Sequence, residues 1–263
     1  MINLTNYRED IHINKSEKSW RGNMENVNLV VDEIVRWLQE KVQEAKAEGL
    51  VFGLSGGIDS AVMAGLAKKA FPNNSLGIIM PCHSDPIDEE HGILVAEKLN
   101  LHTEKVDLSN SFDVLTDSIK VENKNKMAIS NLKPRLRMTT LYYFAQNNNY
   151  LVIGSSNKSE YTVGYFTKHG DSGVDLLPLA SFVKSEIREL ARSLNIPDII
   201  IEKPPTAGLW EDQTDEKEMG FSYDVLDNYI KTGEGPKEIV EKIERMNSIS
   251  EHKRIYPPIF KFK

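Results

Sequence analysis

The chain has 263 residues, of which 40% are hydrophobic and 27% charged, and its formal net charge at pH 7 is −7. These proportions indicate a globular protein that is long enough for one substantial hydrophobic core. The acidic balance disfavours a nucleic-acid-binding surface, which needs clustered lysine and arginine. There is no apolar run of about 18 residues and no recognisable signal peptide, so we expect a cytoplasmic protein without membrane contact. The single cysteine, Cys82, excludes an intrachain disulfide.

Residues 1–22 are polar and lack periodicity, so we treat them as an N-terminal extension to one domain of residues 23–263. Apolar residues recur with helical spacing from Val27 to Ala47, and Gly49 is predicted to end that helix. The pattern further predicts strands at 50–54, 75–80, 102–106 and 150–153, and helices at 60–71, 86–100, 109–119, 124–147 and 184–194. Strands that alternate with helices form βαβ units, so we predict an α/β fold, a single-domain Rossmann-like parallel sheet with helices on both faces. In such sheets ligands bind beyond the carboxyl ends of the strands, where the strand order reverses.

A glycine turn joins the first predicted strand to its helix, within the segment from Gly53 to Ser60. Gly56 and Gly57 let the backbone approach a ligand closely, and the free N–H groups of the next helical turn attract an anion such as phosphate. An ordinary tight turn between strand and helix is the alternative. Asp59 would be unfavourable beside a bound phosphate unless a divalent cation lay between them, so we interpret Asp59 as a Mg²⁺ ligand. The segment fits neither the Walker loop nor the dinucleotide-binding fingerprint.

A second polar turn, Gly154–Glu160, follows the fourth predicted strand. Asn157 or Ser156 is suited to cap the next helix, and Glu160 could complete a capping box there. Glu160 could equally face Asp59 across neighbouring strand ends as a second Mg²⁺ ligand, because Mg²⁺ is usually held by one or two carboxylates with phosphate oxygens and water. The local pattern leaves both interpretations open.

The loop 164–179 combines glycines, aromatic residues and charged residues without periodicity, which is typical of a binding loop. Lys168 is a candidate for contact with a substrate phosphate or carboxylate, and Asp175 for a hydrogen bond to a ribose or an amide. His169 is more simply interpreted as a loop residue than as a catalyst.

Further polar side chains lie where anions are expected. Lys184 opens a helix, where the helix dipole disfavours a positive charge, so a bound phosphate would explain this lysine. Arg135 and Arg137 cannot both face the core, so at least one is free to meet an anion. The rigid turn 203–210 presents Thr206. The acidic residues between 211 and 218 are expected to form a solvated face.

The segment 55–60, Ser-Gly-Gly-Ile-Asp-Ser, resembles the pyrophosphatase loop of the ATP pyrophosphatase superfamily, whose members cleave ATP between the α and β phosphates. A longer series of segments, in the same order, resembles the ammonia-dependent NAD⁺ synthetases. These segments are residues 55–60, 131–138, 154–160, 164–171, 175–179, 204–209 and 252–254. The resemblance runs from about Val27 to the C-terminus and implies the adenine nucleotide alpha hydrolase-like fold.

The resemblance implies the last step of NAD⁺ biosynthesis, in which deamido-NAD⁺, ATP and ammonia give NAD⁺, AMP and pyrophosphate through an acyl-adenylate. It implies a homodimer that uses free ammonia or ammonia delivered by another protein, with Asp59, Lys184 and Glu160 as catalytic residues and Asp59 and Glu160 as Mg²⁺ ligands. The implied ATP-binding residues are Gly53, Leu54, Ser55, Gly56, Gly57, Ile58, Asp59, Ser60, Ser155, Lys184 and Thr206. The implied deamido-NAD⁺-binding residues are Arg135, Lys168, Asp175, His252 and Lys253.

Two other function classes share part of this pattern. An enzyme of the same superfamily that modifies tRNA or forms GMP would keep segment 55–60, but the acidic charge disfavours tRNA and the loop 164–175 disfavours both substrates. A non-enzymatic ATP-sensing module would keep the glycine turn but would have no need for Glu160, Lys168 and Asp175 together.

Overall fold

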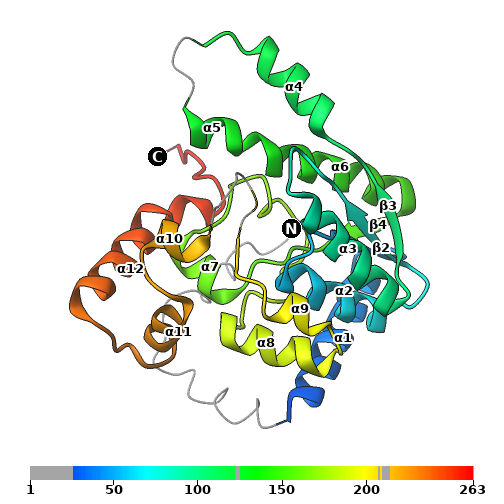
Figure 1. The fold of residues 1–263 in the computed structure, drawn as a ribbon, viewed down its shortest axis with the longest axis horizontal. Helices are drawn as coiled ribbons and strands as arrows, with labels where there is room; N and C mark the ends of the chain where they lie inside the picture. Colours follow the sequence, from blue (N-terminus) through cyan, green and yellow to red (C-terminus); the bar gives the residue numbers. More distant parts are fainter. Residues whose placement is uncertain (1–25, 122–124, 207, 209–213, 263) are drawn as a thin grey trace.

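The computed structural model describes residues 26–121, 125–206, 208 and 214–262 (Figure 1). At its centre lies a four-stranded parallel sheet with the order β3-β2-β1-β4, made of β1 (Gly49–Gly53), β2 (Ser75–Ile79), β3 (His102–Lys105) and β4 (Tyr150–Val152). β1 pairs with β2 on one side and with β4 on the other, so the strand order reverses between β1 and β4. The loops that follow these two strands meet at the usual ligand position of an α/β sheet. The predicted α/β class and parallel sheet are confirmed.

Two hydrophobic cores cover the two faces of the sheet. Leu50 and Phe52 of β1 belong to one core and Val51 to the other, as the alternation of side chains along a strand requires. The first core is closed by α1 (Val27–Glu44), α2 (Ile58–Ala70), α3 (Pro86–Leu99), α8 (Lys184–Ser193) and α9 (Asp198–Ile201). The second core is closed by α4 (Ser109–Ser118) and α6 (Leu132–Asn148), with the short α5 (Lys126–Ser130) before α6. The predicted helices on both faces are therefore present.

A third, smaller core lies among α7 (Lys158–Val163), α10 (Asp215–Met219), α11 (Tyr223–Thr232) and α12 (Lys237–Ile249), which is followed by a 3₁₀ turn at Glu251–Lys253. Buried members of this core include Met219, Tyr223, Leu226 and Ile243. α11 contacts both α7 and α8, so this unit is attached to the helices that follow β4. Figure 1 shows α10, α11 and α12, in orange and red, grouped at one side of the molecule.

Most predicted elements are present with small shifts at their ends, but two helices differ from expectation. α1 ends at Glu44, and the left-handed residue after it is Lys46, with φ of 55°. The expectation that Gly49 ends this helix is wrong, because Gly49 begins β1 and its Cβ would lie 2.1 Å from the carbonyl oxygen of Asn74. The helix predicted at 124–147 is divided into α5 and α6.

Some expectations fall on residues that are not described. The proposed extension 1–22 lies outside the described residues, and the turn 203–210 is described only at 203–206 and 208. In the described part of the chain, none of the helices combines the length and the apolar character that crossing a bilayer requires.

Gly56 is a position in the glycine turn where a side chain does not fit. Its φ is 73°, and a Cβ would lie 2.2 Å from the carbonyl oxygen of Asp88 in α3. Gly233 has a similar φ of 78°, but nothing lies within 4 Å of its Cβ position.

We expect Gly233→Ala to lower the free energy of unfolding by about 1 kcal/mol. Gly56→Ala should cost about 1–3 kcal/mol more, because it also overpacks the contact with α3. Chemical denaturation measures the difference, and equal losses would contradict the close packing of α3 on the turn.

Candidate active site

A cavity of about 680 Å³ opens where the strand order reverses, at the carboxyl ends of β1, β2 and β4. Its wall includes most of the residues that the sequence predicts for binding and catalysis. These are Gly53, Leu54, Ser55, Gly57, Ile58, Asp59, Ser60, Arg135, Ser155, Glu160, Lys168, Lys184, Thr206, His252 and Lys253. Gly56 and Asp175 are the predicted residues that do not line it.

Two serine hydroxyl groups hold the glycine turn after β1. Ser60 Oγ donates to the carbonyl oxygen of Gly57 at 2.9 Å and accepts the N–H of Ser55 at 3.2 Å. Ser55 Oγ lies 3.1 Å from Ser60 Oγ and accepts the N–H of Gly57 at 3.4 Å. Gly57 is also the N-cap of α2, so the positive dipole end of α2 lies at the cavity wall without a capping side chain. This geometry suits phosphate groups.

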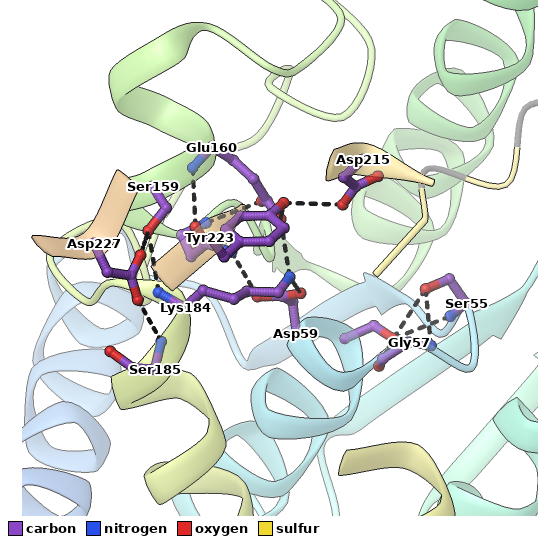
Figure 2. Close-up of polar contacts among 12 residues, drawn as sticks. Ser55, Gly57, Asp59, Ser159, Glu160, Lys184, Ser185, Asp215, Tyr223 and Asp227 are labelled. Carbon is purple, nitrogen blue, oxygen red and sulfur yellow. Dashed lines mark hydrogen bonds and ion pairs between the residues drawn. The ribbon is translucent and has the colours of Figure 1, made fainter. Parts of the chain in front are cut away.

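Lys184 lies at the centre of the charged side chains in the cavity wall (Figure 2). It is the first residue of α8, and only 2% of its side chain is exposed. Its Nζ donates to Asp59 Oδ2 at 2.5 Å and to Glu160 Oε1 at 3.1 Å, and lies 4.9 Å from the centre of the Tyr223 ring. Burial by itself lowers the pKa of Lys184, but the two carboxylates outweigh burial and raise the pKa above its ordinary value. Lys184 therefore stays positively charged at neutral pH although it opens a helix.

Glu160 completes a capping box and also faces Asp59. Its Oε2 accepts the N–H of Asn157 at 3.3 Å, while Asn157 Oδ1 accepts the N–H of Glu160 at 3.0 Å. Asn157 Nδ2 also donates to Asp59 Oδ1 at 2.8 Å, so the cap of α7 is joined to the first turn of α2. Burial raises the pKa of Glu160, and the Asp59 carboxylate adds to this effect while Lys184 opposes it. The two interpretations of Glu160 are thus compatible in one geometry.

Sequence reasoning missed two residues of this cluster, Asp215 and Tyr223. Tyr223 Oη donates to Asp215 Oδ2 at 2.9 Å and lies 3.3 Å from Glu160 Oε1. Asp215 is only 3% exposed, so the expected solvated acidic face is wrong for this residue, and burial raises its pKa. Met219, one turn later on α10, is also buried, and this spacing is the signal that could have placed Asp215 on an inward face.

The lysine and arginine side chains predicted to bind the second substrate donate to backbone carbonyl oxygens of the 164–171 loop and of His252. Lys168 Nζ donates to the carbonyl oxygen of His252 at 2.5 Å. Arg135 donates to the carbonyl oxygen of Lys168, from Nε at 3.4 Å and from Nη2 at 3.3 Å. Lys253 Nζ donates to two carbonyl oxygens of the 164–171 loop, each at 2.8 Å. Side chains from α6, this loop and the C-terminal 3₁₀ turn therefore form one cationic group.

Asp175 is not part of this group. It lies beside β4 at a separate hollow of about 500 Å³, which is also lined by Tyr142. Its Oδ1 accepts the hydroxyl of Tyr142 at 3.1 Å, and its Oδ2 accepts the N–H of Val152 at 2.8 Å. The structure thus places Asp175 against the end of β4 and away from the cationic group in the main cavity.

Arg137 and Thr206 complete the wall of the main cavity. Arg137 Nε donates to the carbonyl oxygen of Met80 at 3.1 Å, and its Nη2 donates to Ser84 Oγ at 3.2 Å. Both acceptors are neutral, and burial lowers the pKa of Arg137 while the nearby Asp171 and Asp88 carboxylates oppose this effect. Thr206 is exposed, and its Oγ1 accepts the N–H of Gly208 at 3.1 Å.

Comparison with known proteins identifies the family. A sequence model described as NAD synthase matches residues 30–257 of the chain. The chain belongs to the NAD synthase family. One relative is the NH(3)-dependent NAD(+) synthetase of Carboxydothermus hydrogenoformans, which is 53% identical over 231 residues, 87% of this chain and 95% of the relative.

Solved structures of similar proteins share this fold. The chain superposes on a structure described as NMN synthetase from Francisella tularensis with a TM-score of 0.87 and 35% identity, over 90% of this chain and 99% of that one. A structure of NH3-dependent NAD synthetase from Campylobacter jejuni, in complex with the nitrate ion, gives a TM-score of 0.76 and 29% identity, over 90% of this chain and 100% of that one. These structures support the adenine nucleotide alpha hydrolase-like fold.

Replacing Lys184 tests how strongly buried charge contributes to stability. Lys184→Met removes the counter-charge of the Asp59 and Glu160 carboxylates, so we expect a loss of about 3–5 kcal/mol in the free energy of unfolding at about pH 8. The loss should shrink at about pH 5, because protonation of Glu160 then removes one uncompensated negative charge. Lys237→Met is the control, since Lys237 is 89% exposed and lies 3.9 Å from Glu241. Denaturation curves at both pH values give the comparison. A loss of free energy of unfolding that is the same at both pH values would contradict the interpretation that Lys184 neutralises the two carboxylates.

Proposed function

We propose that the chain is a ligase that amidates deamido-NAD⁺, with ammonia and ATP, to give NAD⁺, AMP and pyrophosphate. One observation carries the proposal: a single cavity joins a phosphate-binding turn, a buried lysine between two carboxylates, and a group of cationic side chains. The Carboxydothermus relative, named an NH(3)-dependent NAD(+) synthetase, aligns over most of both chains. Neither a tRNA-modifying enzyme nor an ATP sensor accounts for this combination.

We assign ATP to the turn after β1 and the side chains opposite it. The residues that would contact it are Gly53, Leu54, Ser55, Gly56, Gly57, Ile58, Asp59, Ser60, Ser155, Lys184 and Thr206. The N–H groups and serine hydroxyls of the turn, which bond to one another here, would bind phosphate oxygens in their place. Gly56 would contribute through its backbone conformation, since it does not line the cavity.

The reaction needs no nucleophilic side chain. A carboxylate oxygen of the nicotinate attacks the α-phosphorus of ATP, the bond to the bridging oxygen breaks, and pyrophosphate leaves. Ammonia then attacks the acyl carbon, AMP leaves with the former carboxylate oxygen, and the nitrogen loses a proton. Lys184 and the first turn of α2 would stabilise the negative charge that grows on the departing pyrophosphate.

We propose that Asp59 and Glu160 hold Mg²⁺. The two carboxylates lie on neighbouring loops beside the phosphate-binding turn and converge on one buried ammonium group, and oxygen donors of this kind suit Mg²⁺. The described residues contain no group of three or more His, Cys, Asp or Glu side chains arranged to hold a metal, so phosphate oxygens and water would complete the coordination. When bound, the ion would supply positive charge to the phosphates.

We propose that deamido-NAD⁺ binds along Arg135, Lys168, His252 and Lys253, with Asp175 at a second point of contact. The support is that these four residues line the cavity beside the ATP site, where Lys168 donates to the carbonyl oxygen of His252 and Arg135 to that of Lys168. Asp175 lies at a different hollow, so it would contact a separate part of an extended dinucleotide.

Amidation of nicotinate mononucleotide is the second candidate. It is favoured by the likeness to the structure described as NMN synthetase, which has a TM-score of 0.87. This substrate lacks the AMP half of deamido-NAD⁺, so it would leave part of the cationic group or the Asp175 hollow unused.

We further propose a cytoplasmic homodimer in which residues 23–263 form one synthetase domain after the extension 1–22. The helices α4 to α6 expose apolar side chains that a second copy could cover, including Val114, Met127 and Tyr143. Cys82 is free and buried, which suits a reducing compartment.

The products test the proposed function directly. AMP, pyrophosphate and the amide product are measured in parallel from ATP, Mg²⁺ and ammonium, with deamido-NAD⁺, with nicotinate mononucleotide, and with neither. The amide product is NAD⁺ from the first nucleotide and nicotinamide mononucleotide from the second. We expect equal amounts of the three products with deamido-NAD⁺. Faster amidation of the mononucleotide would favour the second candidate, and pyrophosphate release that ignores both nucleotides would overturn the proposal.

Glu160→Gln separates the charge of this residue from its capping role. Glutamine at this position preserves a capping box, so we expect stability to change little, while kcat falls on the order of 100-fold and recovers partly at high Mg²⁺. Glu186→Gln is the matched control, because Glu186 Oε2 accepts the N–H of Val183 at 2.9 Å at the start of α8. Steady-state kinetics over a series of Mg²⁺ concentrations measure kcat for both variants. Equal effects of the two substitutions would contradict a metal role for Glu160.

A further inference from the structure

Asp227 lies in α11 and is only 4% exposed, although it carries a carboxylate. It does not line the main cavity, so it does not meet the substrates there. Its Oδ2 accepts a backbone N–H in the first turn of α8, the helix that begins with Lys184, and its Oδ1 accepts the hydroxyl of Ser159 in α7 (Figure 2).

The contacts of Asp227 form a short relay to Lys184. Asp227 Oδ2 accepts the N–H of Ser185 at 2.7 Å, and Asp227 Oδ1 accepts the hydroxyl of Ser159 at 2.6 Å. Ser159 Oγ in turn accepts the N–H of Lys184 at 3.1 Å. The first backbone N–H groups of α8 are thus satisfied from α7 and α11, two other helices.

The sequence explains why α8 needs acceptors from outside. Its N-cap residue is Val183, which has no polar side chain and makes no capping hydrogen bond. Unsatisfied N–H groups at a buried helix start are costly, and a carboxylate there also interacts favourably with the helix dipole. Asp227 and Ser159 therefore supply the acceptors for the first N–H groups of α8, the helix that begins with Lys184.

The same relay reaches the second carboxylate of the site. Ser159 is the neighbour of Glu160 in α7, so its bonds to Asp227 and Lys184 hold α7 and α8 in register. Tyr223, one turn before Asp227 on α11, lies with its ring 4.9 Å from Lys184 Nζ and its hydroxyl 3.3 Å from Glu160 Oε1. One face of α11 thus supports Lys184 at both its backbone and its ammonium group.

We propose that Asp227 is a positioning residue, which acts through Ser159 and the start of α8 to set Lys184 against Glu160 for the chemical step. The inference rests on the proposed function, because its kinetic readout is the formation of NAD⁺. It assigns a role in catalysis to a residue that does not touch the substrates.

The first arm of the test compares Asp227→Asn and Ser159→Ala with the control Asp224→Asn. Asp224 lies on the same helix but is exposed, so its substitution changes the charge of α11 without touching the relay. We expect kcat to fall about 10–100-fold in the two relay variants, with KM for deamido-NAD⁺ within about twofold of the original. A kcat for Asp227→Asn equal to that of Asp224→Asn would overturn the proposal.

The second arm asks whether the effect passes through Lys184. Asp227→Asn should cost no further activity in a Lys184→Met background, and the Asp227→Asn/Ser159→Ala double variant should be no slower than the slower single variant. If the residues act only through separate effects on the structure, the fold-losses of activity in the single variants should multiply in the double variants. That result would overturn the relay, even if one single variant were poorly folded.

A third readout does not depend on activity. Hydrogen exchange of the backbone N–H groups of Lys184 and Ser185 should be faster in Asp227→Asn than in Asp224→Asn, and unchanged exchange would overturn the relay. If the unaltered protein forms no NAD⁺, the proposed function fails, and this exchange experiment still decides whether Asp227 holds the start of α8.

Discussion

The ion pairs of the buried Lys184 ammonium with Asp59 and Glu160 are the interaction on which the arrangement of the site depends. The three residues come from α2, which follows β1, and from α7 and α8, which follow β4, and they meet where the strand order reverses between β1 and β4. Removing such charges from water is costly, and a buried ion pair is weak support for stability by itself. The three charged groups of this cluster line the cavity beside the turn after β1, where the proposed ATP site would use them.

The surrounding structure restricts this cluster from several directions. The glycine turn brings the start of α2 to the cavity, and α3 packs so closely on the turn that Gly56 has no room for a Cβ. The capping box of α7 fixes Glu160 while its asparagine binds Asp59. α11 contacts Lys184 through the Tyr223 ring, and its Asp227 accepts the N–H of the next residue, Ser185. α3, α7 and α11 therefore restrict the geometry of Lys184, Asp59 and Glu160.

Local sequence patterns predicted the parts of the molecule that depend on local physics. Alternating strands and helices gave the parallel sheet, and the glycine turn beside Asp59 was recognisable from its residue types alone. The role of Glu160 stayed open because a capping acid and a cavity acid look the same until Asp59 is placed beside it. Gly49 was assigned to the end of a helix because its close approach to Asn74 is a contact between distant residues. The acidic run 211–218 predicts a solvated face because its high charge outweighs the four-residue spacing of Asp215 and Met219, and the partner of Asp215, Tyr223, lies on the next helix. Whether the predicted site residues bind the proposed substrates stays a prediction.

A crystal structure with Mn²⁺ in place of Mg²⁺ and a non-hydrolysable ATP analogue would test the central claim most directly. Anomalous scattering locates the metal independently of its surroundings. We predict a single strong peak within coordination distance of both Asp59 and Glu160, with Lys184 Nζ bonded to a phosphate oxygen. A metal peak that touches neither carboxylate, or a triphosphate bound away from the turn after β1, would contradict the assignment of this cavity as the site of adenylation.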